Sequence, residues 1–166
     1  MRAARVLPRL RLLVPPRVLA AVLRTWFNGW CTKRRFQGKG VCLFGCPFGE
    51  DSVDHYMCCS KLHIYGQARL RLPLAREFPD RGLSFMLLEA SSSMTNAVLT
   101  RRALLVAAAY RLHCRHRRAP HPLEEASLSR ALDQAVKEAS LGHPRAMHCL
   151  DMTWRIGVAA QPTRLG

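Results

Sequence analysis

The sequence predicts a mainly helical protein, made of a small zinc-stapled loop-and-helix unit followed by a helical hairpin, with disordered termini. Leucine, alanine and arginine dominate the chain, while aromatic residues make up only 7% of its 166 residues. This composition favours helices over packed sheets. Apolar residues also recur at three-four spacing in separate segments, which is the periodicity of amphipathic helices. The length accommodates one domain and is too short for two ordinary ones.

Residues 1–15 are predicted to be a disordered basic arm. The N-terminus as far as about Arg24 is rich in arginine, contains no acidic residue and is interrupted by Pro8, Pro15 and Pro16. An arginine-rich, acid-free N-terminus is also typical of an organelle transit peptide, although this one lacks serine. A basic arm and a transit peptide therefore both stay open, as does the question of whether Met1 is the true start.

The first predicted helix begins at Pro16, because proline is tolerated in the first turn of a helix. Asn28-Gly29 ends it as a C-cap. One face of this helix is apolar and carries two aromatic rings, with Val18, Leu19, Val22, Leu23, Trp26 and Phe27 at three-four spacing. Such a face needs a partner, either within the chain or outside it.

The segment from Cys42 to Cys59 carries the clearest chemistry, with four cysteines and a histidine in a short stretch. Gly45 gives the first cysteine pair, Cys42 and Cys46, the freedom to form a tight turn. His55 and Cys59 are four residues apart, so on a helix they share a face. Thiolates and imidazole are the ligands that zinc prefers, and four protein ligands leave no open position, as in structural sites. Cys42, Cys46, His55 and Cys59 are therefore the predicted ligands of one structural zinc ion.

Cys58 is the alternative fourth ligand, because it lies three residues after His55. The helix that carries these ligands is expected to begin at Asp51 or Ser52 and to end near residue 62. Residues 16–64 are thus predicted to be one helix-plus-zinc unit. Its spacing, C-x3-C-x8-H-x3-C, matches neither a retroviral zinc knuckle nor a C2H2 finger.

The rest of the chain is predicted to be a linker, a hairpin and a tail. Residues 65–94 contain several prolines and a short helix at about 83–89. A helical hairpin covers 95–152, with its first helix from about Thr95 to His116 and its second from about Glu124 to Ser140. Gly142-His143-Pro144 stops the second helix. No further helix is predicted, and residues 153–166 are expected to be a disordered tail.

The charge of the chain indicates a polyanionic partner. Its 26 basic and 11 acidic residues give a net charge of +15, and the first acidic residue is Glu50. Aromatic rings alternate with cations before that point, a pattern that suits phosphate contact and base stacking. The candidate nucleic-acid-binding residues are Arg24, Trp30, Lys33, Arg34, Arg35, Phe36 and Lys39. Alternatively, the rings form a small core beside the zinc. The two interpretations, nucleic-acid contact and an aromatic core, are compatible.

Short runs around the cluster carry a family resemblance. They are Arg24-Thr25-Trp26, Asn28-Gly29-Trp30-Cys31-Thr32, Arg35-Phe36-Gln37, Glu50-Asp51-Ser52, Asp54-His55-Tyr56, and, further on, Tyr110-Arg111-Leu112-His113 and residues 131–143. Together they resemble the zinc-binding region downstream of the polymerase in LINE-type (non-LTR) retrotransposon reverse transcriptases. The resemblance implies a region that grips template RNA or target DNA during target-primed reverse transcription. The polymerase motif Tyr/Phe-x-Asp-Asp does not occur in this sequence, so no catalysis of its own is expected.

The preferred function is nucleic-acid (RNA or DNA) binding by a remnant of such a reverse transcriptase, with the parent polymerase domain as a second partner. Two alternatives stay open: a helical protein–protein interaction module that docks through residues 18–27 and 104–112, and a non-functional product of a decayed element. The odd count of seven cysteines and the lack of a secretory signal indicate a reducing compartment. An intracellular, nuclear location is favoured, with an organelle as the alternative.

Overall fold

A computed structural model describes residues 2–47, 49–73, 80–87, 94–119 and 121–159. Within these ranges every regular element is helical, apart from one isolated antiparallel bridge between Val41 and Glu50. The prediction of a mainly helical fold is therefore confirmed. In chain order the elements are α1 (Arg2–Leu13), α2 (Pro16–Trp26), the 3-10 turn η1 (Arg34–Phe36), α3 (Val53–Cys58), α4 (Ser60–Leu70), α5 (Asp80–Phe85), α6 (Asn96–His116), α7 (Glu125–Ser140) and α8 (Pro144–Ala159).

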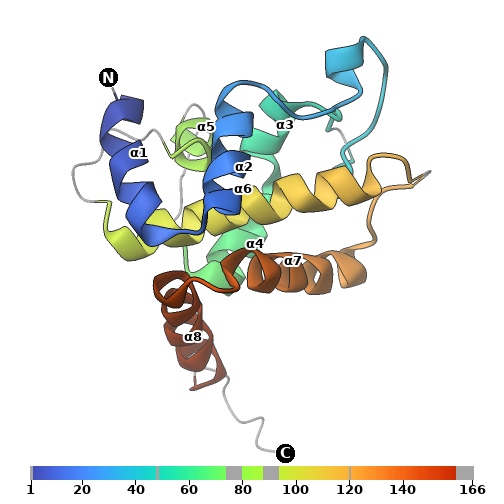
Figure 1. The fold of residues 1–166 in the computed structure, drawn as a ribbon. Helices are drawn as coiled ribbons and strands as arrows, with labels where there is room; N and C mark the ends of the chain where they lie inside the picture. The colour runs from blue at the N-terminus through green and yellow to red at the C-terminus, as the bar shows by residue number, and fades with distance from the viewer. Residues whose placement is uncertain (1, 48, 74–79, 88–93, 120, 160–166) are drawn as a thin grey trace, which may run out of the picture.

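Helix α6 runs through the middle of the molecule, with α1 and α2 on one side and α4 and α7 on the other (Figure 1). Every residue from Ala103 to Ala109 is buried, as expected of a helix enclosed on all sides. The Thr95 hydroxyl accepts a hydrogen bond from the Val98 N–H and caps the start of the helix. One hydrophobic core includes Trp30 and Tyr56 from the predicted zinc unit and Leu132 from the hairpin. The two predicted units therefore share a core.

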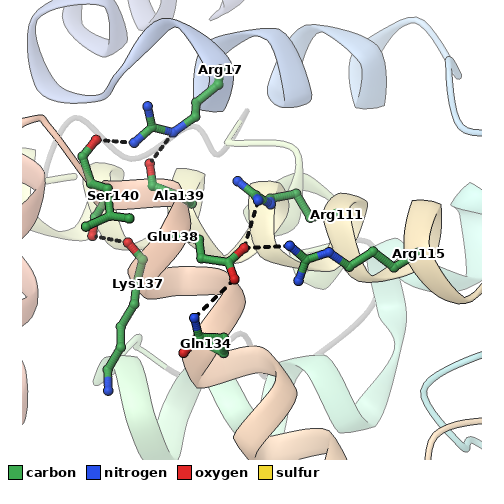
Figure 2. A network of polar contacts seen from close by, with 9 residues as sticks. Arg17, Arg111, Arg115, Gln134, Lys137, Glu138, Ala139 and Ser140 are labelled. Carbon is green, nitrogen blue, oxygen red and sulfur yellow. Dashed lines mark hydrogen bonds and ion pairs between the residues drawn. The ribbon is translucent and has the colours of Figure 1, made fainter.

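The packing of α6 against α7 includes a polar network (Figure 2). Glu138 accepts hydrogen bonds from Arg111 and Arg115 of α6, each at 2.7 Å between nitrogen and oxygen. Arg17 of α2 donates to the carbonyl of Ala139 at 3.2 Å and to that of Leu141, at the end of α7. Cations at a helix C-terminus also complement the helix dipole. The network thus ties α2, α6 and α7 together.

The structure differs from the prediction of a disordered arm over residues 1–15. Residues 2–13 form helix α1, which packs on α6, with Leu10 and Leu13 buried. Arg9 donates to the Met94 carbonyl at 2.7 Å and to Asn96 Oδ1 at 2.9 Å. Burial and these bonds outweigh the helix-breaking tendency of Pro8, a tertiary effect that local sequence does not reveal.

The two apolar faces expected to dock on a partner bury each other instead. Val18 and Val22 of α2 are fully buried, as is Leu104 of α6, and the two helices are in contact. Residues 18–27 and 104–112 therefore do not offer the docking surface that the interaction-module alternative required. Phe27 is an exception, because its side chain is 79% exposed.

Several helix boundaries also differ from the sequence-based ones. The helix expected to end near residue 62 is two helices, α3 and α4, which meet at Cys59, and α4 reaches into the predicted linker. The short linker helix lies at Asp80–Phe85 rather than at 83–89, and residues 88 and 89 fall outside the described ranges. The expected hairpin is present as α6 and α7, but α8 follows it. The predicted tail therefore begins within a helix, while residues 160–166 lie outside the described ranges.

Within the described ranges, no helix combines the length and the hydropathy that crossing a bilayer requires.

The burial of α6 predicts a large stability effect at its centre. Leu104→Ala should lower the free energy of unfolding by about 2–5 kcal/mol, because it removes a fully buried side chain and leaves a cavity. Ile64→Ala is the matched control, since Ile64 is 60% exposed and should change stability by about 0.5 kcal/mol or less. Urea unfolding followed by circular dichroism measures both, and equal effects would contradict the described core.

Candidate metal centre

Four side chains that the sequence singled out lie together in the structure. One ligand atom each from Cys42, Cys46, His55 and Cys59 falls within 4.8 Å of the others. The Sγ of Cys59 is 3.3 Å from that of Cys46 and 3.9 Å from that of Cys42. Zinc–sulfur bonds of about 2.3 Å in a tetrahedron place sulfurs about 3.8 Å apart. The cluster is thus close to the geometry that a tetrahedral metal ion requires.

A short hairpin supplies the first two ligands. The Cys42 N–H donates to the Gly49 carbonyl at 2.7 Å, and the Gly49 N–H donates to the Cys46 carbonyl at 3.3 Å. Gly45 makes the turn between the cysteines with a φ of +79°, a conformation that favours glycine. The turn at Gly45 was expected from the sequence.

Gly49 is a functional residue that the sequence analysis missed. A Cβ atom at this position would overlap the imidazole ring of His55 and would press against Cys42. The position therefore has to be glycine for the histidine to reach the cysteines. Its only signal in the sequence is a glycine between the ligand pair and the histidine helix.

The second pair of ligands comes from the junction of α3 and α4. Ser52 caps α3 by accepting a hydrogen bond from the His55 N–H at 3.1 Å, and His55 lies in the first turn. Cys59 lies in neither helix: its ψ of 115° is extended, and this break turns its sulfur toward the hairpin. The expectation that His55 and Cys59 share one continuous helix is therefore wrong, although both contribute to the cluster. Cys58, the alternative ligand, ends α3 and is not part of the group.

The electrostatics of the cluster favour a bound cation. The thiol of Cys59 lowers the pKa of Cys42 to about 4, against the effect of burial. The Cys59 thiol donates a hydrogen bond to the Cys42 thiolate, and this bond, together with burial, raises the pKa of Cys59. Cys42 also raises the pKa of His55, again against burial. A metal ion would displace these protons and neutralise the thiolates.

The donor atoms of the cluster are suited to a metal ion. Three sulfurs and one imidazole form a closed set, with all three cysteines buried. Within the described part of the chain, His55 Nε2 is buried and has no hydrogen-bond partner. Such an atom is costly unless something satisfies it. Cys42, Cys46, His55 and Cys59 can therefore hold a metal ion, and soft thiolates with one imidazole are a set that zinc accepts.

Asp51 connects this centre to the rest of the protein. Its carboxylate is buried and accepts hydrogen bonds from the Tyr56 hydroxyl at 2.7 Å, His113 Nε2 at 3.1 Å and the Lys33 N–H at 2.9 Å. Burial raises the pKa of Asp51, but the bonds from His113, Tyr56 and Lys33 outweigh it and leave the pKa below its usual value. The Asp51 carboxylate is therefore held charged in the interior, between the metal hairpin and α6.

The structure separates the candidate nucleic-acid-binding residues into two groups. Trp30 is fully buried, and its indole N–H donates to Thr25 Oγ1 at 2.9 Å. Its ring packs among those of Tyr56, Tyr110 and His113. Trp30 is thus a core residue, and the prediction that it contacts a base is wrong. The other six candidates are exposed: Arg24, Lys33, Arg34, Arg35, Phe36 and Lys39.

Five of these residues, Lys33, Arg34, Arg35, Phe36 and Lys39, lie on and beside η1, close to the metal hairpin, whereas Arg24 lies in α2. The Arg34 side chain pairs with Glu50 at 3.3 Å, and Arg35 donates to the Asn28 carbonyl at 2.9 Å. Arg24 lies over the ring of Tyr110, 5.5 Å from its centroid. Phe36 is 68% exposed among these cations. Phe27, next to Asn28, is also exposed, and sequence reasoning missed it because it had been assigned to the packed face of α2.

No protein family, no curated protein and no solved structure matches the chain.

The ligand assignment predicts which cysteine the metal requires. The purified protein should hold one equivalent of zinc, and Cys42→Ser or Cys59→Ser should release it, because a closed set cannot lose a thiolate without weakening. Cys58→Ser is the matched control and should retain the metal. Elemental analysis with circular dichroism measures content and helicity. Retention of zinc in Cys59→Ser together with loss of zinc in Cys58→Ser would show that Cys58, not Cys59, is the fourth ligand.

The Asp51 hydrogen bonds predict a pH-dependent stability. Asp51→Asn should lower the free energy of unfolding by about 2–4 kcal/mol at neutral pH, because the Lys33 N–H loses its acceptor and the charge is removed. The contribution of Asp51 is present above its ordinary pKa of about 3.9 and is lost as pH falls through the lower folded value.

Denaturant unfolding at several pH values should therefore show the two proteins converging only below about pH 4. Acid also releases metal, but it does so from both proteins, so their difference isolates Asp51. Asp151→Asn, at an exposed position on α8, should have little effect at any pH. A wild-type advantage that persisted unchanged into strong acid would argue against a buried charge.

Proposed function

We propose that this chain is a nucleic-acid-binding module that is stabilised by one structural zinc ion and has no catalysis of its own. Its ligands would be Cys42, Cys46, His55 and Cys59, and its contact surface would be the exposed residues on and beside η1. The observation that carries the proposal is a cationic, aromatic loop that hydrogen-bonds to Asp51, which lies in the chain between the cysteine hairpin and His55 of the Cys3His cluster.

The metal hairpin and the basic loop are connected through the backbone. The Lys33 N–H donates to the carboxylate of Asp51, and the Arg34 N–H donates to its carbonyl at 3.2 Å. The Asp51 N–H in turn donates to the Gly40 carbonyl at 2.9 Å. Residues 33–40 are thus held at both ends by one residue of the metal unit. Zinc would therefore orient the loop without touching the nucleic acid.

The side chains of this loop suit a flexible, single-stranded segment. Phe27 and Phe36 are the most exposed of the large apolar residues described, and each neighbours a cation or a residue bonded to one. Exposed rings between cations are typical of surfaces on which bases stack while phosphates are neutralised. Such contacts carry little sequence information, so weak sequence selectivity is expected.

A second basic cluster, made of Arg111, Arg115, Arg117 and Arg118, lies at the end of α6. Arg111 and Arg115 are both paired with Glu138, so they are less available to a phosphate than the loop cations. In the loop only Arg34 has an acidic partner among the described residues, and that pair is exposed. Exposed ion pairs contribute little and exchange easily.

We further propose that the module is the C-terminal zinc-binding part of a LINE-type reverse transcriptase, which would make the parent polymerase domain its neighbour. The support is that the runs carrying the resemblance meet in space. Trp30, Asp51, Tyr56 and His113 come from separate runs and form one buried cluster beside the metal ligands. Because these residues pack against one another in the fold, the separate runs that carry the resemblance belong to one structural unit.

The proposed surface predicts how variants should bind nucleic acid. Phe36→Ala should weaken binding of a labelled single-stranded RNA by about 1–3 kcal/mol through lost stacking. Arg35→Ala with Lys39→Ala should reduce the slope of log K against log salt by about 1.4, since two phosphate contacts are removed. Fluorescence anisotropy of the zinc-loaded protein over a salt series measures both effects.

Matched controls separate this surface from net charge and from exposed apolar area. Arg11→Ala with Arg130→Ala removes the same charge from exposed sites on α1 and α7, and Ile64→Ala removes an exposed apolar side chain elsewhere. Both controls should bind nearly as the parent protein does. Equal losses in the controls and in the loop variants, or no binding at low salt, would reject the proposal.

A further inference from the structure

A groove lies at the opposite end of α6 from the metal centre. The end of α1, the start of α6 and helix α8 form its walls, and its volume is about 590 Å³. Leu13, Ala97 and Met152 contribute apolar surface to it. It shares no residue with the metal centre or with the basic loop, so neither of those sites accounts for it.

The apolar part of the groove is partly open to solvent, since of the three apolar residues named above only Leu13 is buried. Met152 is 51% exposed, and Ala97 is exposed as well. Leu12, next to Leu13, is 66% exposed, and its carbonyl accepts a hydrogen bond from Arg145 of the groove. Neighbouring apolar side chains left in water are typical of an interaction surface. A surface this open suits a segment laid across it better than a small molecule, which a pocket usually encloses.

The charged side chains that line the groove share one sign. Arg71, Arg101 and Arg145 lie along it, and none of its described lining residues is acidic. Arg101 donates hydrogen bonds to the carbonyls of Leu70 and Ala97, so it holds the end of α4 against α6 in the groove wall. Arg71 and Arg145 are exposed. The first turn of α6, which also has no acidic residue, adds the positive end of its dipole. The groove is therefore complementary to carboxylates.

Nucleic acid matches this groove less well than the basic loop does. No Phe, Tyr or Trp occurs among its described lining residues, and His148 supplies a single imidazole, so bases would find little stacking surface. A phosphate backbone would also leave the apolar floor exposed to water. The combination of apolar floor and cationic rim instead matches a protein segment with apolar residues on one face and acidic residues beside them, as in helix-in-groove recognition.

We propose that this groove binds an acidic amphipathic segment of a partner protein. Its apolar side chains would cover Leu13, Ala97 and Met152, and its carboxylates would pair with Arg71 and Arg145. This inference is independent of the proposed nucleic-acid function, because it uses different residues at the other end of α6.

A designed peptide tests the proposal on the full chain loaded with zinc. The probe is a fluorescein-labelled peptide of about fourteen residues, with leucine at three-four spacing and glutamate elsewhere. It should bind saturably, while the same peptide with lysine in place of glutamate, or with serine in place of leucine, should not. No saturable binding of the acidic peptide up to about 1 mM would overturn the proposal.

Groove variants locate the binding. Arg71→Glu with Arg145→Glu, and separately Met152→Glu, should each weaken peptide binding by about tenfold or more. Arg130→Glu is the matched control on exposed α7 and should leave binding nearly unchanged. Circular dichroism and zinc content must stay at the parent values in all of them, and two independent groove variants keep the test valid if one fails to fold.

Two other outcomes would overturn the assignment of the occupant. Displacement of the peptide by single-stranded oligothymidylate, with loss of oligothymidylate binding in the groove variants, would make the groove part of the nucleic-acid surface. A concentration-dependent dimer in sedimentation analysis that the groove variants dissolve would make a second copy of this chain the occupant.

Discussion

The buried carboxylate of Asp51 is the interaction on which the arrangement of this protein depends. It accepts hydrogen bonds from the loop before the metal hairpin, from α3 and from α6, at Lys33, Tyr56 and His113. A buried charge is unfavourable unless donors satisfy it, so the carboxylate is stable only when all three parts of the chain are in place. Because the ionised Asp51 carboxylate can only accept, His113 donates to it from Nε2.

The metal centre and Asp51 reinforce each other. Asp51 follows the hairpin that holds Cys42 and Cys46 and precedes the helix that holds His55, so closing the cluster brings its carboxylate to α6. Trp30 and Tyr56 pack their rings 5.4 Å apart beside it and exclude water from the hydrogen bonds. A metal ion in the cluster would therefore stabilise more than its own loop, because the core packs directly on its ligand-bearing segments.

Local sequence was sufficient for the elements whose signals are local. The periodicity of residues 18–27 and the proline at position 16 predicted α2, the apolar residues after Thr95 predicted α6, and spacing alone gathered the four candidate ligands. Helices α1 and α8 were missed because their stability comes from burial of Leu10 and Leu150 against distant parts of the chain. No pattern within either segment carries that information.

The misassignment of individual residues has the same cause, which is packing against distant parts of the chain. Trp30 and Phe27 are both aromatic residues beside cations, and sequence cannot decide which ring is enclosed. Trp30 finds Thr25 as a partner for its indole N–H, and the rings of Tyr56 and His113 as neighbours, whereas Phe27 follows the end of α2. The break at Cys59 was equally invisible, since the four-residue spacing that selected it also fits a continuous helix.

The length of α6 has a consequence for how the protein could work. Ala97 lies in the groove and His113 lies beside the metal unit, and a rise of 1.5 Å per residue places them about 24 Å apart on one rigid rod. Ligands at the two ends would not compete for space, so both could be held at once. If both proposed sites bind their partners, the protein would act as a coupler: it would raise the effective concentration of one partner near the other, at a separation set by the helix.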